Sequence, residues 1–345
     1  MVYIELMHIL ETAFNAVFPI VLLILLGYLL RRSGAMDEKF VKTGSKLGFN
    51  IFLPAMLFMN VYNIEGVEAI RWDVVLYCIP MIFVIFLLCM ATIGLASPVP
   101  ERRGVILQAS FRSNMAIIGL SLSSALGGPE AVAVAAIVSA FTIPVMNVLA
   151  VIALSLYVNG EGQNKPSIKS VVLNILKNPL IIAIALGLLC LVVRALEIRW
   201  FGEVVFSLSR DVKVVYTCVN NLKSIASPLA LLVLGGQFTF GATKSFLREI
   251  AAGTLWRVVL SPLITIGLAV ILSTYTPLLN FGANEYPALI ALFGTPAAVS
   301  TAIMAGQMGN DEQLATQLVV WSSIASIVTM FLTVCLLMAG GLLMA

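Results

Sequence analysis

The chain has 345 residues, of which 60% are hydrophobic and 11% are charged, with a formal net charge of +3 at pH 7. A soluble domain of this composition would expose large apolar patches, so the composition excludes an ordinary soluble protein. Many apolar runs approach the ~20 residues that cross the hydrocarbon core of a bilayer. The sequence therefore predicts an all-α integral membrane protein, with the lipid bilayer as a partner and no nucleic acid.

Polar clusters divide the apolar sequence into ten expected transmembrane helices. They cover residues 11–31, 44–62, 74–96, 104–127, 130–157, 171–196, 214–238, 250–274, 286–308 and 312–340. The segment from Met1 to Glu11 is acidic and lacks the small-residue cleavage site of a signal peptide. We therefore expect the first span to remain as a membrane helix.

The two sets of five spans resemble each other in the order of their prolines and glycines. The matched residues are Pro19 with Pro179, Gly27 with Gly187, Pro54 with Pro228, and Pro80 with Pro262. Because each set has an odd number of spans, a second copy would lie upside down relative to the first, as in many secondary transporters. We expect a five-helix repeat at 1–157, a cytoplasmic connecting loop at 158–170 and an inverted five-helix repeat at 171–345.

The basic residues of the loops are unevenly divided between the two sides of the membrane. One side has 12, which are Arg31, Arg32, Lys39, Lys42, Lys46, Arg102, Arg103, Lys165, Lys169, Lys177, Lys244 and Arg248. The other has five, which are Arg71, Arg194, Arg199, Arg210 and Lys213. Since cytoplasmic loops carry the excess of Lys and Arg, the sequence predicts an inner-membrane protein with both termini outside the cytoplasm.

Helices four and nine carry the residues expected at a substrate site. In inverted-repeat carriers the substrate lies near the midplane, where discontinuous helices leave backbone groups unpaired. Glycine and proline interrupt helices, and we expect breaks at 119–121 and 294–296. The alternative, that both helices are only kinked or closely packed, stays open.

Three basic residues fall inside the expected spans, where a charge costs roughly 2.5 to 3.5 kcal/mol or more and must face protein, water or ligand. Arg112 lies in helix four beside Asn114, and two interpretations stay open for it, substrate contact and snorkelling to the cytoplasm. Lys223 and Arg257 lie within two turns of a helix end, and we expect them to be interfacial anchors.

Acidic residues are absent from the expected midplane. Asp73, Glu130, Glu249, Glu285, Asp311 and Glu312 fall at loop or helix-end positions. A buried site with basic and amide groups but no carboxylate pair suits an anion and argues against a cation antiporter. The five cysteines are scattered and there is one histidine, so neither a metal nor a cofactor is expected.

Five segments of the sequence together resemble one known family. They are PIVLLILLGYLLRRSGAMDEKF and NIFLPAMLF in the first two helices, RSNMAIIGLSLSSALGG in the fourth, ASPLALLVLGGQF in the seventh and GTPAAVSTAIMAGQMGND in the ninth. The family that they resemble is that of the auxin efflux carriers, which has an asparagine in its fourth helix and includes bacterial malate and malonate permeases. The likeness covers nearly the whole chain, without the long hydrophilic loop of the plant carriers.

The resemblance implies ten transmembrane helices, crossing of helices four and nine at the substrate site, and an elevator-like movement. Asn114 matches the family's helix-four asparagine and Pro296 its helix-nine crossover proline, whereas Ser121 stands where the other crossover proline is usual. The expected substrate-binding residues are Arg112, Asn114, Gly119, Ser121, Gly294, Thr295, Pro296 and Ser300.

The expected function is secondary transport of a small mono- or dicarboxylate, without catalytic residues. A sodium-coupled organic anion symporter of related fold is the first alternative. A membrane sensor that binds the ligand without moving it is the second, although the sequence has no signalling domain. The sequence has no GxxxxGK[ST] phosphate loop, which argues against a primary pump. The substrate, the direction of transport and the coupling ion stay open. The oligomeric state also stays open, and a homodimer is one of the alternatives.

Overall fold

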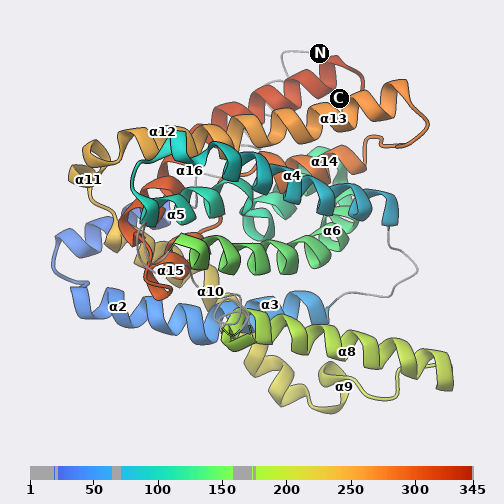
Figure 1. The fold of residues 1–345 in the computed structure, drawn as a ribbon. Helices are drawn as coiled ribbons and strands as arrows, with labels where there is room; N and C mark the ends of the chain where they lie inside the picture. Colours follow the sequence, from blue (N-terminus) through green and yellow to red (C-terminus); the bar gives the residue numbers. More distant parts are fainter. Residues whose placement is uncertain (1–18, 20–21, 64–70, 158–172, 174–175, 344–345) are drawn as a thin grey trace.

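The computed structural model describes residues 19, 22–63, 71–157, 173 and 176–343, and in this part of the chain the regular structure is helical (Figure 1). Residues 11–18, 20 and 21 of the first expected span, the acidic segment before it and the expected loop at 158–170 lie outside the described residues.

Within the described residues, six helices are long and apolar enough to cross a membrane. They are α4 (Trp72–Ala96), the segment Leu122–Tyr157 of α6 (Leu120–Tyr157), α8 (Pro179–Phe201), α10 (Lys213–Gln237), Leu247–Tyr275 and α16 (Glu312–Ala339). The segment Leu247–Tyr275 consists of α12 (Leu247–Leu255), the π-helix η3 (Trp256–Leu260) and α13 (Ser261–Tyr275). These six overlap six of the ten expected spans. Helix α6 leaves helical geometry at Gly127 and Gly128, so its first turns belong to the expected span 104–127 and the rest to 130–157.

The other four expected spans do not form single long helices in the described part of the chain. Residues 44–62 combine the end of α2 (Glu38–Leu47), the π-helix η1 (Gly48–Phe52) and α3 (Leu53–Tyr62). The expected helices four and nine are each broken, and the first span is only partly described. A count of ten, and the inverted relation of two repeats, therefore stay predictions.

The described helices pack as two groups (Figure 1). The peripheral group consists of α2, α3, α8 and α10, in which α3 packs extensively on α8 and α10. The crossing group consists of α4, α5 (Pro100–Phe111), α6, α12, α13, α14 (Glu285–Leu289), α15 (Ser300–Gln307) and α16. Few contacts join the groups, and most of these involve α15 or α8.

Glycines permit the closest helix contacts of the peripheral group. A Cβ atom on Gly27 would lie 2.2 Å from the carbonyl oxygen of Leu232 in α10, and one on Gly187 would lie 3.1 Å from that of Phe58 in α3. Gly27 and Gly187 are the pair that the sequence matched between its halves. Each brings the first helix of one half against the second helix of the other.

Two polar clusters fasten the crossing group at opposite ends of α4. At its start Arg71 pairs with Asp73 and with Glu285 at the start of α14. Beyond its end Arg102 at the start of α5 pairs with Glu249 of α12 at 3.0 Å and with Asp311, the N-cap of α16, at 3.3 Å. In both clusters one arginine joins the starts of helices that are distant in sequence.

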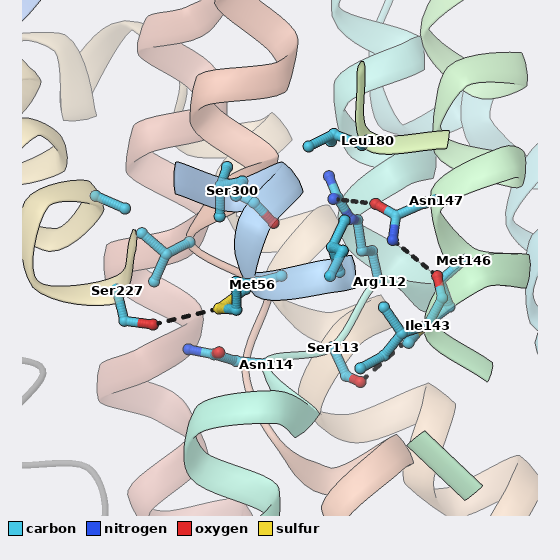
Figure 2. A pocket seen from close by; sticks show the side chains of 15 residues that line it. Met56, Arg112, Ser113, Asn114, Ile143, Met146, Asn147, Leu180, Ser227 and Ser300 are labelled. Atoms are coloured by element: carbon cyan, nitrogen blue, oxygen red, sulfur yellow. Dashed lines mark hydrogen bonds between the residues drawn. The ribbon is translucent and has the colours of Figure 1, made fainter. Parts of the chain in front are cut away.

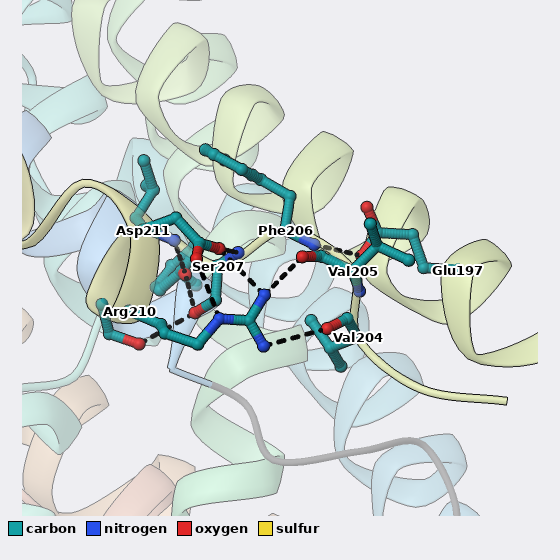
Figure 3. A network of polar contacts seen from close by, with 10 residues as sticks. Glu197, Val204, Val205, Phe206, Ser207, Arg210 and Asp211 are labelled. Carbon is teal, nitrogen blue, oxygen red and sulfur yellow. Dashed lines mark hydrogen bonds and ion pairs between the residues drawn. The ribbon is translucent and has the colours of Figure 1, made fainter. Parts of the chain in front are cut away.

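A third polar network orders the turn between α8 and α10 (Figure 3). Arg210, in the short helix α9 (Leu208–Asp211), pairs with Asp211 at 2.9 Å and donates to the backbone carbonyls of Val204 and Val205. Its hydrogen bond to Asp211 holds the pKa of that carboxyl below the usual value. Glu197 accepts the amides of Val205 and Phe206, so the turn is held by side chains where it leaves regular helix.

Candidate functional site

The first helix break lies at Arg112 to Asn114 and not at 119–121, so the sequence-based location is wrong. Helix α5 ends at Phe111, Arg112 is extended (φ −84°, ψ 100°), and a π-helix, η2 (Met115–Gly119), leads directly into α6. Gly119 instead permits close packing, because a Cβ atom there would lie 2.8 Å from the Cβ of Ala291. The backbone of Ser121 is helical.

The second break lies where the sequence predicted it. The π-helix η4 (Ile290–Gly294) ends at Gly294, Thr295 is extended (φ −72°, ψ 156°), and α15 begins at Ser300. Pro296 contributes to this geometry because a proline disfavours the helical conformation in the residue before it.

The two breaks cross and pair through their backbones. The amide of Asn114 donates to the carbonyl of Pro296 at 2.8 Å, and the amide of Ala298 donates to the carbonyl of Arg112 at 3.0 Å. Ser113 and Ala297 thereby form an isolated antiparallel β-bridge. Each break supplies the hydrogen bonds that the other has lost from its helix, which stabilises extended backbone in the interior.

Arg257 binds the carboxyl ends of both broken helices. It is fully buried, and it donates to the backbone carbonyls of Thr295, Leu292 and Phe293 at 2.7 to 2.9 Å and to that of Ser110 at 3.2 Å. Helix carboxyl ends carry unpaired carbonyls and partial negative charge, which a cation stabilises. The prediction that Arg257 is an interfacial anchor is therefore wrong.

A small cavity lies beside the crossing, between the peripheral and the crossing groups (Figure 2). It offers about 50 Å³ to the centres of water molecules, enough for a few of them. Its lining residues are Leu53, Met56, Leu57, Arg112, Ser113, Asn114, Ile143, Met146, Asn147, Leu180, Ser227, Ala230, Ala298, Val299 and Ser300. The cavity is thus mainly apolar, with one cation and a few neutral polar groups.

Arg112 brings a buried positive charge to this cavity without a carboxylate to neutralise it. The residue is 4% exposed, and its side chain donates to the Asn147 Oδ1 atom at 2.6 Å (Figure 2). It also donates to the Met304 Sδ atom at 3.1 Å, and these are the partners it has among the described residues. Asn147 is itself fixed by a bond from Nδ2 to the carbonyl of Ile143 at 2.8 Å. Both acceptors are neutral, so the desolvated charge of the guanidinium is not offset.

Asn114 adds an amide that is available to a ligand. It is 4% exposed, and its Nδ2 group is buried with no hydrogen-bond partner in the described part of the chain. Ser300 also lines the cavity as the first residue of α15, whose amino end carries partial positive charge. A buried unpaired donor costs about 1 to 3 kcal/mol, which a bound acceptor would recover.

The cavity contains only three of the eight expected site residues, Arg112, Asn114 and Ser300. Gly294, Thr295 and Pro296 form the crossing behind it, Gly119 packs against η4, and the Ser121 side chain lies outside what the structure describes. Sequence reasoning missed the polar lining residues Ser113, Asn147 and Ser227. Asn147 could have been identified as a candidate site residue, because it is an asparagine inside an apolar span and a buried amide in a membrane needs hydrogen-bond partners.

Carboxylates are absent from the described lining of the cavity. The buried Glu249 and Glu285 belong instead to the polar clusters at the ends of α4. No group of three or more metal-binding side chains occurs within the described residues. Lys223, which the sequence marked as an interfacial anchor, lies half-buried in α10, and that role stays a prediction.

Comparison with known proteins agrees with this architecture. Residues 12–334 match a family model described as membrane transport protein. The chain is also 23% identical over 330 residues to an uncharacterised transporter of Methanothermobacter thermautotrophicus, an alignment that covers 92% of this chain and 95% of that protein. The chain therefore belongs to the membrane transport protein family, that of the auxin efflux carriers, and is a transporter and not an enzyme.

Proposed function

We propose that the protein is a secondary transporter of small organic anions, with mono- and dicarboxylates such as malonate and malate as its substrate class. The observation that carries the proposal is the buried guanidinium of Arg112, which has neutral partners and faces a cavity without a described carboxylate. A bound carboxylate would neutralise this charge and accept from the unpaired Nδ2 group of Asn114.

We further propose that the crossing group carries the substrate past the peripheral group in an elevator-like movement. The cavity lies on the boundary of the groups, so a displacement of one would move Arg112 and Asn114 relative to Ser227 of α10. Internal ion pairs at both ends of α4 favour movement of the crossing group as one body. The contacts of Gly27 and Gly187 support the inverted repeat on which such a movement rests.

Two other functions are distinguished by measurement. A sodium-coupled symporter of related fold would require a sodium gradient, whereas the described lining of the cavity has no carboxylate that would favour sodium. Uptake into liposomes with sodium replaced by choline separates the two. A sensor would bind carboxylates without moving them across the membrane.

The decisive experiment combines binding and transport. Purified protein is heated with a panel of mono- and dicarboxylates, with chloride as the inorganic control, because a ligand of the native state at 100 times its Kd adds about 2.7 kcal/mol of stability. The best ligand is then tested for uptake by the wild type, Arg112→Ala, Asn114→Ala and the exposed control Arg199→Ala.

We expect the first two variants to lose ligand-induced stabilisation and uptake, and Arg199→Ala to retain both. Wild-type levels of binding in Arg112→Ala and Asn114→Ala would overturn the site. The absence of any stabilising or transported carboxylate would overturn the substrate class.

A further inference from the structure

Another cavity adjoins the one beside Arg112, on the side that the loop charges assign to the cytoplasm. It offers about 290 Å³ to the centres of water molecules, and its lining includes Ser155, Lys177, Pro179 and Gln307. We call it the mouth cavity, and the cavity beside Arg112 the crossing cavity.

The same helices line both cavities. In α6, Asn147 lines the crossing cavity and Ser155 the mouth cavity, and these residues are about 12 Å apart along the helix. The first and last residues of α15 face the two cavities in the same way. At the start of α8, Pro179 lines the mouth cavity and its neighbour Leu180 the crossing cavity. The mouth cavity therefore lies between the crossing and the expected cytoplasmic side.

Apolar side chains separate the two cavities. Val151 of α6 and Ile303 of α15 are each one helical turn from the residues that line either cavity, and both are buried. Ile303 reaches η1, where its Cδ1 atom would lie 3.5 Å from a Cβ atom on Gly48. Each cavity can therefore hold its own ligand.

Ser155 has a buried hydroxyl group that is available to a ligand. The residue is 2% exposed, and its Oγ atom has no hydrogen-bond partner in the described part of the chain. Helical serines often donate to a carbonyl three or four residues earlier, as Ser139 of the same helix donates to that of Ala136 at 2.7 Å. Because Ser155 makes no such bond, a bound acceptor would satisfy its hydroxyl group.

Two sources of positive charge border the mouth cavity. Lys177 supplies an ammonium group, and Asn178 and Pro179 bring the amino end of α8, a helix of 23 residues, to the lining. A helix amino end favours an anion. The amide of Leu180 is already bound by the Asn178 Oδ1 atom at 2.9 Å, so the direct contacts fall to Lys177 and Ser155. The described lining contains no carboxylate that would compete for them.

We propose that the mouth cavity is a second carboxylate-binding site, in which a substrate carboxylate pairs with Lys177 and accepts a hydrogen bond from Ser155. The inference rests on the proposed function and adds a binding site on the cytoplasmic side of Arg112. The phosphate group of an anionic lipid offers the same chemistry, so the test separates the two sources.

The test counts bound ligand by equilibrium dialysis of purified protein in detergent against saturating radiolabelled malonate, malate or acetate. The wild type should bind two molecules per chain. Arg112→Ala should keep the one in the mouth cavity, and Lys177→Glu should keep the one in the crossing cavity, because a like charge repels a carboxylate. The double variant should bind none.

Lys244→Glu is the matched control, because it reverses the charge of an exposed lysine on the same expected side that lines neither cavity. It should bind two molecules per chain like the wild type. Loss of one molecule in this variant as well would mean that the overall charge of this face, and not a site at Lys177, holds the second ligand.

A local reporter checks the place of binding. In Arg112→Ala with the five native cysteines replaced, Ser155→Cys should react with an anionic methanethiosulfonate reagent. The best ligand from the dialysis, at about ten times its Kd, should slow this reaction about tenfold, since it fills most of the sites. Adding Lys177→Glu should abolish the protection, whereas protection that persists would contradict the part assigned to Lys177.

Nanodiscs separate a substrate from a lipid. The molecule that depends on Lys177 should stay bound in discs of phosphatidylcholine and in discs that also contain phosphatidylglycerol. Its displacement by phosphatidylglycerol would assign the mouth cavity to a lipid phosphate and overturn a substrate site.

The counts also separate this inference from the proposed function. A single bound molecule that Arg112→Ala removes and Lys177→Glu leaves would overturn the second site and leave the proposed function standing. A single molecule that only Lys177→Glu removes would support the mouth cavity and overturn binding at Arg112. A wild type that binds none of the three carboxylates would overturn both.

Discussion

The backbone amide of Asn114 donates to the carbonyl of Pro296 at 2.8 Å, so that each of the two broken helices completes the other. Pro296→Ala should loosen this contact, because an alanine no longer restrains Thr295 to its extended conformation and lets η4 continue as a helix. We expect carboxylate uptake to fall more than the amount of folded protein. Uptake is measured per folded molecule, as quantified by size-exclusion chromatography.

Pro80→Ala is the matched control, because Pro80 lies inside α4 on an exposed face away from the cavity. It should leave uptake per folded molecule close to that of the wild type. Equal effects of both substitutions would mean that the proline at the crossing has no special part in transport.

The planar guanidinium of Arg112 should bind a carboxylate more tightly than a positive charge alone would. Arg112→Lys keeps the charge but loses the planar fork that can hold Asn147 and a carboxylate together. We expect carboxylate binding to weaken by about 1 to 2 kcal/mol, the scale of a charge-assisted hydrogen bond, and Arg112→Ala to be weaker still. Isothermal titration of the two variants measures this order, and equal affinities for wild type and Arg112→Lys would contradict bidentate binding.

Arg257 should support the fold and not the ligand. Arg257→Met fills similar space but leaves four buried carbonyls without their donor, at about 1 to 3 kcal/mol each where water does not replace it. We expect a clearly lower Tm in detergent, since the carboxyl ends of both broken helices lose their common cation. A Tm within a degree or two of the wild type would instead fit a residue that snorkels to the interface.

The spans that the sequence predicted best are those in which apolar length alone decides the structure, as in α4 and α16. The break at 294–296 was also predictable, because Gly294 and Pro296 both disfavour a continuous helix. The break at Arg112 to Asn114 was not, since these residues do not themselves interrupt a helix. It arises from tertiary contacts, namely backbone pairing with the second break and the bond from Arg257 to Ser110.

The chemistry of the site was easier to predict from the sequence than the identity of its residues. Arg112 and Asn114 were identified because charged and amide groups inside a span are costly and must face protein, water or a ligand. Ser227 escaped notice because serine is common in membrane helices and its position opposite the crossing depends on how α10 packs. Arg257 was assigned to the interface from its distance along the helix, whereas its role is set by helix ends distant in sequence.

Close contact at Gly235 should be essential for the peripheral group. A Cβ atom on Gly235 would lie 1.9 Å from the carbonyl oxygen of Ile24, so Gly235→Ala must push the first helix away from α10. We expect a loss of about 1 to 3 kcal/mol, as for overpacked cores, seen as a lower Tm in detergent. Gly267→Ala is the control, because nothing lies within 4 Å of the added atom, and unchanged Tm values in both variants would contradict the contact.

Both termini should lie outside the cytoplasm, because the basic residues divide 12 to five between the two sides. A single cysteine added after Ala345, with the five native cysteines replaced, should react with a membrane-impermeant maleimide in intact cells whose outer barrier has been opened. A cysteine at position 163, in the expected cytoplasmic loop, should react only after lysis. The reverse pattern would invert the topology. Labelling of the terminal cysteine only after lysis, with a cysteine near the N-terminus labelled in intact cells, would instead contradict an even number of spans.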